Sequence, residues 1–180
     1  KDKNFFNLPL NNFKKISIDL DSWSPEKKNY DLIISNFFLN ISNKIETDIK
    51  KISLSLVSNG FFIATLPSPE NFYLLKSAML KTDLQIYGGA YNRFNPTIDL
   101  HNIIEILKKN NFKIPLVNSE KIKIDYKKFN QLLHDIRSMN LSYYYKDKKN
   151  IFEKKMYFKE LEKNFGKNSK GNFELISNFY

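Results

Sequence analysis

Cysteine is absent from this 180-residue sequence, and histidine occurs only as His101 and His134. The absence of cysteine excludes a disulfide scaffold, a cysteine-ligated metal site and a thiol nucleophile, and two histidines argue against a multi-histidine metal centre. No apolar run approaches the roughly 20 residues that span a bilayer, and the start does not resemble a signal peptide. We therefore expect a soluble, cytoplasmic protein without a metal or a transmembrane segment.

Arginine is also scarce, since it occurs only at Arg93 and Arg137, although the formal net charge is +10. Such a charge is compatible with binding to nucleic acid or to an anionic membrane surface. Lysine, however, is spread over almost every segment, as in proteins of AT-rich genomes. Because arginine supplies most bidentate contacts to phosphates and bases, the composition gives little support to a nucleic-acid surface.

The stretch Tyr30–Asn36 is the clearest structural signal in the chain. Its short apolar run is typical of a strand buried on both faces in the middle of an α/β sheet. Ligands of open α/β sheets bind beyond the carboxyl ends of such strands. Ser35 and Asn36 are therefore the first candidates for a site.

Other periodic segments alternate around this strand. The sequence predicts strands at Lys15–Leu20, Phe61–Leu66, Phe112–Val117, Ile122–Tyr126 and Asn172–Tyr180, and capped helices that begin near Asn43, Ser68, Thr97, Phe129 and Asn150. The segment Gln85–Pro96, with its two glycines, is predicted to be a loop. This order indicates one α/β domain over residues 1–180, with a mostly parallel sheet, an antiparallel C-terminal strand and flanking helices.

Two stretches resemble the third and fourth motifs of class I S-adenosylmethionine-dependent methyltransferases, namely Ile18–Pro25 and Tyr30–Asn36. The later half, with Gly88-Gly89-Ala90, Lys123–Tyr126 and Leu133–Met139, resembles the methyltransferase type 11 group that includes complex I assembly factor 5. The malonyl-carrier-protein methyltransferases are more distantly similar. The resemblance runs from about Ile16 to the end of the chain and implies an incomplete doubly wound, Rossmann-like sheet.

The resemblance also implies site residues. In that family the acid after the third strand and its neighbour contact the adenine, which corresponds here to Asp19 and Leu20, while Ser35, Asn36 and Phe37 would line the methionine end and the substrate side. A turn-forming role for Asp19 and ordinary strand-end polarity for Ser35 and Asn36 are the simpler alternatives.

The sequence departs from the family where the cofactor loop should be. A glycine-rich loop after the first strand cradles the cofactor in the family, whereas the first glycine here, Gly60, follows the central strand, and Asn40-Ile41 replaces a common His-Trp pair. Either the N-terminal half is missing or the protein is a shortened, inactive descendant. Without that half a sheet edge is left unpaired, which favours self-association.

Aromatic and cationic residues in the later half are the candidates for substrate binding: Tyr87, Tyr91, Arg93 and Arg137. Packing beneath a loop is the alternative for the two tyrosines. Methyl transfer is an in-line displacement that depends mainly on positioning, so no catalytic residue is assigned.

Three functions follow from these observations. The first is a methyltransferase-like protein that acts on a protein substrate in respiratory complex I assembly, with S-adenosylmethionine as cofactor if the missing half is supplied. The second is a non-catalytic assembly module, which the missing glycine loop favours. The third is an RNA methyltransferase, which predicts a basic, arginine-bearing groove beside Asn36.

Overall fold

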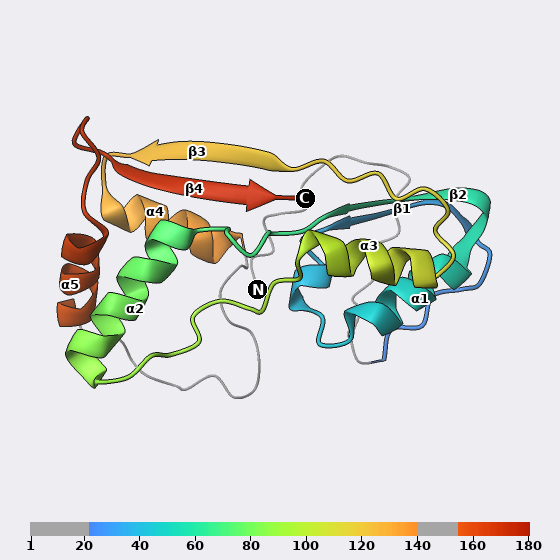
Figure 1. Cartoon of the computed structure of the whole chain (residues 1–180), viewed down its shortest axis with the longest axis horizontal. Helices are drawn as coiled ribbons and strands as arrows, with labels where there is room; N and C mark the ends of the chain where they lie inside the picture. Colours follow the sequence, from blue (N-terminus) through green and yellow to red (C-terminus); the bar gives the residue numbers. More distant parts are fainter. Residues whose placement is uncertain (1–21, 140–154) are drawn as a thin grey trace, which may run out of the picture.

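The computed structural model describes residues 22–139 and 155–180. Four strands and five α-helices make up this part of the chain, together with one short 3-10 helix (Figure 1). In chain order they are β1 (Tyr30–Asn36), η2 (Leu39–Ile41), α1 (Ile45–Ser55), β2 (Leu56–Thr65), α2 (Tyr73–Tyr87), α3 (Leu100–Lys109), β3 (Glu120–Tyr126), α4 (Phe129–Ser138), α5 (Lys155–Phe165) and β4 (Phe173–Phe179).

The strands form two pairs that meet end to end. β1 and β2 are parallel, and β3 and β4 are antiparallel. Backbone hydrogen bonds between Leu66 and Tyr180, with N···O distances of 3.2 and 2.9 Å, and an antiparallel bridge between Pro67 and Phe179 join the pairs. The predicted α/β class with an antiparallel C-terminal strand is therefore confirmed. Instead of one continuous sheet, however, two short sheets share this junction.

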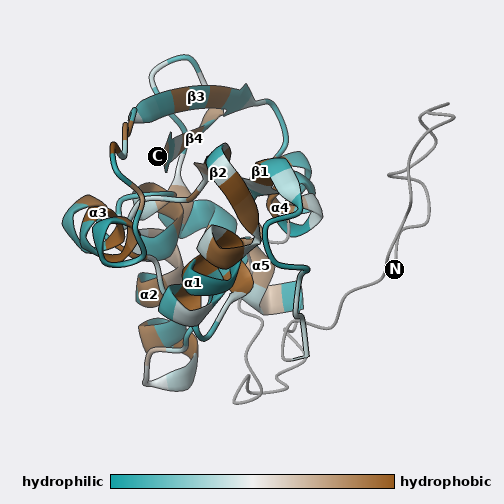
Figure 2. Cartoon of the chain, turned by 90° about the vertical axis from the view of Figure 1, so that its right-hand side faces the viewer, coloured by the Kyte–Doolittle hydropathy of each residue, from teal (hydrophilic) through white to brown (hydrophobic). Residues whose placement is uncertain are grey.

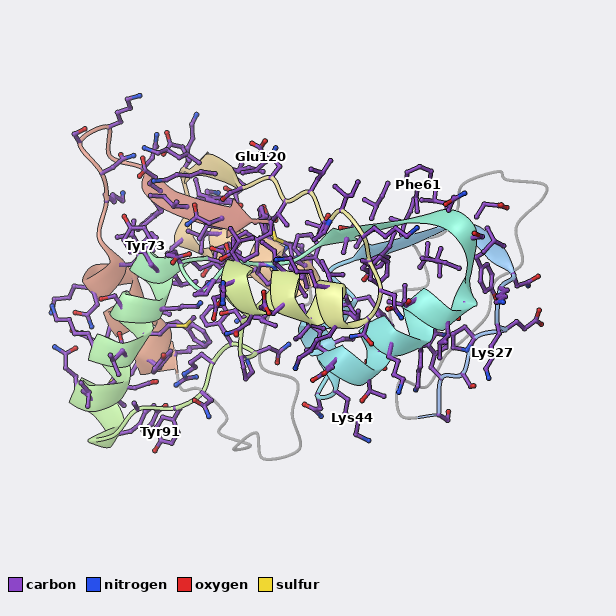
Figure 3. The ribbon with its side chains drawn as sticks, turned by 45° about the vertical axis from the view of Figure 1, so that its right-hand side comes forward. Lys27, Lys44, Phe61, Tyr73, Tyr91 and Glu120 are labelled. Carbon is purple, nitrogen blue, oxygen red and sulfur yellow. The ribbon has the colours of Figure 1, made fainter. Side chains whose placement is uncertain are left out.

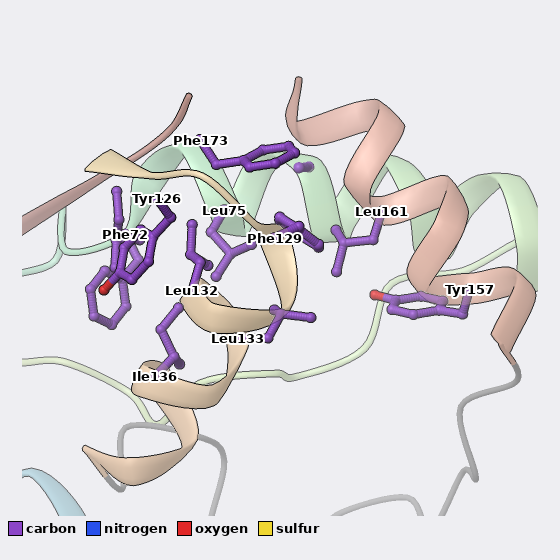
Figure 4. Close-up of a cluster of buried hydrophobic side chains, with 12 residues drawn as sticks. Phe72, Leu75, Tyr126, Phe129, Leu132, Leu133, Ile136, Tyr157, Leu161 and Phe173 are labelled. Carbon is purple, nitrogen blue, oxygen red and sulfur yellow. The ribbon is translucent and has the colours of Figure 1, made fainter. Parts of the chain in front are cut away.

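Each pair of strands has its own hydrophobic core. The larger cluster lies between β3, β4 and the helices α2, α4 and α5, and Figure 4 shows its side chains converging. The smaller cluster lies between β1, β2, α1 and α3. The buried members of the larger cluster are Phe72, Leu75, Ala78, Tyr126, Phe129, Leu132, Leu133, Ile136, Tyr157, Leu161, Phe173 and Leu175, and those of the smaller one are Leu39, Ile49, Ile52, Leu56, Leu66 and Ile103.

The described residues cover one face of the β1–β2 sheet. Ile33 and Phe62, which pair in register, pack against the smaller cluster. On the opposite face Ile34 is 64% exposed and Phe61 is 71% exposed, and Figure 2 shows the hydrophobic colour along β2. The prediction that Tyr30–Asn36 is buried on both faces is wrong, because α1 and α3 pack against one face and no described helix covers the other.

The predicted strand Phe112–Val117 is also wrong. This segment is irregular from Phe112 to Ser119, and Leu116 is 90% exposed. Alternating apolar residues suggested a strand, but Pro115 has no N–H to donate and none of the described strands pairs with the segment. Phe112 packs against the β1–β2 sheet, with its ring centroid 5.6 Å from that of Phe62.

Several predicted helix ends differ from the observed ones. The N-cap of α1 is Lys44 rather than Asn43, and no side chain caps this helix end. Ahead of the helix, the Ser42 hydroxyl accepts a hydrogen bond from the Lys44 N–H and donates one to Asp48. The helix ends at Ser55, since Leu56 already pairs with Tyr30 in the sheet.

The predicted caps of α2 and α3 were misplaced as well. α2 begins at Tyr73, after Phe72 in a left-handed conformation, and continues into the predicted loop as far as Tyr87. Asp99, rather than Thr97, caps α3. The predictions at Lys15–Leu20 and Asn150 lie outside the described residues, whereas α4, β3 and the terminal strand are confirmed.

Candidate functional site

The carboxyl ends of β1 and β2 lie side by side. Ser35 pairs with Ala64 and Asn36 with Thr65 in the parallel register. The chain then turns at Phe37, which has a positive φ of 55° and donates its N–H to the Thr65 carbonyl. Because parallel strands deliver their following loops to one edge, the segments after β1 and β2 share that edge with the start of α3.

The predicted cofactor residues of β1 point in different directions. Ser35 is buried, and its hydroxyl has no hydrogen-bond partner among the described residues. Asn36 is exposed, as strand alternation requires. Phe37 packs edge-on against Phe179, with ring centroids 5.2 Å apart. Asp19 and Leu20, the predicted adenine contacts, lie outside the described residues.

A cavity of about 480 Å³ opens at this edge. Its walls come from the turn after β1, the start of α1, the end of β2 and the segment that leads into α3. The lining residues are Leu39, Asn40, Ser42, Asn43, Ile45, Leu66, Pro67, Pro96, Thr97, Ile98, Asp99 and Asn102. Half of this lining is apolar and half is polar, and a single residue, Asp99, carries a charge.

Asn40 supplies the buried polar group of the cavity. Its side chain is 7% exposed, and its Nδ2 has no hydrogen-bond partner within the described ranges. Buried amide donors are nearly always paired in native proteins, so an orphaned one beside a cavity indicates an acceptor brought by a ligand or water. The sequence marked Asn40 only as a departure from a family pattern, and its burial could not be predicted from that.

Asp99 supplies the charge. Its carboxylate accepts hydrogen bonds from the backbone N–H and the side-chain amide of Asn102. The backbone hydrogen bond from Asn102 is the main cause that lowers the Asp99 pKa, so the carboxylate is ionised at neutral pH. The sequence analysis overlooked Asp99, although an aspartate directly before a helical stripe is a common N-cap signal.

Tyr180 lies beside this carboxylate. Burial is the first cause that raises the Tyr180 pKa, and the nearby charge of Glu70 acts in the same direction. The Glu70 pKa is in turn lowered, first by the hydrogen bond from the Ser68 hydroxyl at 2.8 Å. The charges of Glu70 and Asp99 thus both raise the Tyr180 pKa.

Three of the predicted substrate residues come together elsewhere. The Arg93 guanidinium donates to both carboxylate oxygens of Asp83, a residue of α2 that is 1% exposed. It also lies over the Tyr157 ring of α5, at 4.6 Å from the centroid, and over the Tyr91 ring at 5.8 Å. Tyr87 stacks on Tyr157 as well, with centroids 5.9 Å apart. None of these residues lines the cavity, and their geometry is that of a tie between α2, the following loop and α5.

Arg137, the fourth predicted substrate residue, lies in the last turn of α4. Its guanidinium is exposed and lies 5.7 Å from the centroid of the Phe158 ring. The predicted arginine-bearing groove beside Asn36 is therefore not supported, because one arginine is tied to Asp83 and the other stacks on α5. Figure 3 shows Tyr91 well away from the exposed sheet residue Phe61.

No protein-family profile matches this chain. Among curated proteins it is similar to the mitochondrial arginine-hydroxylase NDUFAF5 of Dictyostelium discoideum, with 31% identity over 114 residues that cover 63% of this chain and 26% of that protein. The human protein of the same name is 22% identical over 68% of this chain and 36% of its own length.

Solved structures decide the fold. The chain superposes on a Bacillus halodurans protein described as a methyltransferase with a TM-score of 0.57, at 8% identity, over 92% of this chain and 74% of that chain. The YcgJ protein of Bacillus subtilis gives a TM-score of 0.53 over 89% of this chain and 65% of that chain. The chain has the fold of class I methyltransferases.

The methyltransferase fold is represented here only in part. The chain matches between a quarter and about a third of the length of the curated relatives. In the described part of this methyltransferase fold, no group of three or more potential metal-ligating side chains occurs. None of its described helices is long and apolar enough to cross a membrane.

Proposed function

We propose that this chain is the substrate-side part of a methyltransferase-like protein that acts on another protein during respiratory complex I assembly. The similarity to NDUFAF5 carries the proposal, because it accompanies a methyltransferase fold. The relatives named here are mitochondrial. The predicted cytoplasmic location remains a prediction.

S-adenosylmethionine is the cofactor that this fold suggests. The chain would contribute Asp19 and Leu20 to the adenine, and Ser35, Asn36 and Phe37 to the methionine end. The buried Ser35 hydroxyl fits such a role, because it lies at the carboxyl end of β1 and lacks a partner among the residues that the structure describes. The bound cofactor would supply an electrophilic methyl group, and these residues would position it.

The group that the protein acts on is proposed to be a basic side chain of another protein, and the relatives' name, arginine-hydroxylase, favours arginine. Transfer of a methyl group to its nitrogen would release one proton to solvent. The cavity supports this choice, since its lining contains no Lys, Arg or His and one ionised carboxylate, Asp99. A phosphate-bearing ligand would meet no counter-charge there. The same observation argues against the RNA methyltransferase, which would need cations along the substrate path.

Calorimetric titration of S-adenosylmethionine tests the cofactor proposal, carried out with this chain and with the full-length product of its gene. We expect binding, and we expect Asp19→Ala or Ser35→Ala to weaken it about tenfold, the usual effect of one lost hydrogen bond to a bound ligand. Glu105→Gln is the control, because Glu105 is exposed and its one ion pair among the described residues is with Lys108. Equal affinity of all variants would refute the residue assignment.

A second candidate is a non-catalytic assembly module. The sequence favours it by lacking a glycine-rich cofactor loop, since its five glycines include only one adjacent pair, Gly88-Gly89. This candidate predicts no S-adenosylmethionine binding by either protein form, together with retention of complex I subunits in an affinity purification. Binding of the cofactor with a micromolar or tighter dissociation constant would exclude it.

A further inference from the structure

The lining of the cavity at the carboxyl ends of β1 and β2 is chemically asymmetric. Apolar walls from Leu39, Leu66 and Ile98 enclose it, and its polar groups are amides, hydroxyls and one carboxylate. In a chain with 29 Lys and Arg residues, no cation contributes to the lining. The cavity therefore suits a ligand with an apolar body, a hydrogen-bond acceptor and a positive charge.

The hydrogen-bond acceptor of such a ligand has a possible partner among the lining residues. The Asn40 Nδ2 is buried and has no hydrogen-bond partner among the described residues. A buried donor without an acceptor costs free energy, which an incoming carbonyl oxygen would recover. η2, which holds Asn40 between Leu39 and Ile41, fixes the position of this amide at the end of β1.

The positive charge of the ligand has a partner in the same lining, at the start of α3. Asp99 is exposed at the start of α3, and its two hydrogen bonds from Asn102 leave further lone pairs on both carboxylate oxygens. The charge of Glu70 also acts on Tyr180, but Glu70 does not line the cavity. Asp99 is the one charged residue of the lining, so a cation bound there would pair with its carboxylate.

We propose that Asn40 and Asp99 recognise a segment of a protein substrate. The Asn40 amide donates a hydrogen bond to a backbone carbonyl of that segment, and the Asp99 carboxylate pairs with a cationic side chain of the same segment. The inference rests on the proposed function, in which the acceptor is such a side chain. It assigns the two contacts that would give the cavity its specificity, one for the backbone and one for the charge.

Nuclear magnetic resonance titration tests this pair with two probes, the blocked tripeptides acetyl-Gly-Arg-Gly-amide and acetyl-Gly-citrulline-Gly-amide. Citrulline keeps the shape of arginine and removes its charge. We expect the arginine peptide to shift the Asn40 side-chain amide resonances and to bind about threefold or more tightly than the citrulline peptide, in line with one exposed ion pair.

Two conservative variants separate the contacts. Asp99→Asn keeps the helix cap, because asparagine caps as well as aspartate, and it should make the two peptides bind equally. Asn40→Leu keeps the branched shape of the side chain and should weaken both peptides about tenfold, the effect of one lost hydrogen bond. Its urea midpoint should not fall, since the substitution removes an orphaned donor. Glu105→Gln, on the same helix as Asp99, should behave as the unmodified chain.

The outcomes distinguish the inference from the proposed function. The inference is overturned if both variants bind the arginine peptide with unchanged affinity, or if the resonance shifts lie away from Asn40 and Asp99. Either result would leave the proposed arginine substrate in place. Failure of the unmodified chain to bind either peptide refutes the proposed acceptor itself. A lower urea midpoint for Asn40→Leu would show that Asn40 has a structural role, which also overturns the inference.

Discussion

Replacement of Arg93 tests the contacts by which this residue connects Asp83 of α2 with Tyr157 of α5. The Asp83 carboxylate is 1% exposed and the Arg93 side chain 20% exposed, so Arg93→Met leaves a buried negative charge without its partner. Breaking a buried ion pair in this way costs about 3 to 5 kcal/mol. Because Arg93 retains some contact with solvent, we expect about 3 kcal/mol, the lower end of that range.

Urea unfolding, followed by far-ultraviolet circular dichroism, measures this loss. Arg137→Met is the matched control, because the other arginine of the chain is exposed and stacks on Phe158; it should cost about 0.5 to 1 kcal/mol. The double variant Asp83→Leu/Arg93→Met should recover most of the loss, since replacing both partners leaves no unpaired charge. If Arg93→Met lowered the free energy of unfolding no more than Arg137→Met, the ion pair with Asp83 would add no stability beyond a stacking contact. Arg93 would then again be a candidate for substrate binding.

Two further predictions concern other parts of the fold. Burial, assisted by the hydrogen bond to Asp135, raises the pKa of Tyr126 to about 12 from 10.0; stability from this group is therefore complete below pH 10 and is lost as the pH rises toward 12. Tyr126→Phe should flatten that part of a melting-temperature profile against pH, and an unchanged profile would contradict the assignment. The uncovered sheet face predicts that Ile34→Thr with Phe61→Thr reduces dye binding and self-association in gel filtration while the free energy of unfolding stays within about 1 kcal/mol; a large loss of stability would show that this face is covered.

Local patterns in the sequence predicted the helices and strands well where periodicity and tertiary structure agree. The stripe Phe129, Leu132, Leu133 and Ile136 is fully buried, as its spacing indicated. Tyr30–Asn36 is a strand, but the sequence cannot say how many layers cover a sheet, and its burial was therefore overestimated. Phe112–Val117 shows the same limit, because an apolar alternation becomes a strand only where another strand offers its edge.

The candidate site was predictable only in its position. The rule that ligands bind beyond parallel strands indicated the edge after Ser35 and Asn36, and a cavity opens at that edge, although neither residue lines it. Asn40 and Asp99 were missed because their significance depends on burial and on which wall each one faces. Arg93 attracted attention through the scarcity of arginine, whereas its partner Asp83 lies ten residues earlier on α2, a pairing that spacing alone does not reveal.

The junction between the two sheets has a mechanical consequence. Leu66 and Pro67 belong both to the short bridge with β4 and to the wall of the cavity. The two hydrophobic cores on either side of this bridge are separate clusters, so a small rotation of one core relative to the other would act on the bridge first. A substitution that weakens the bridge would therefore also disturb this wall of the cavity.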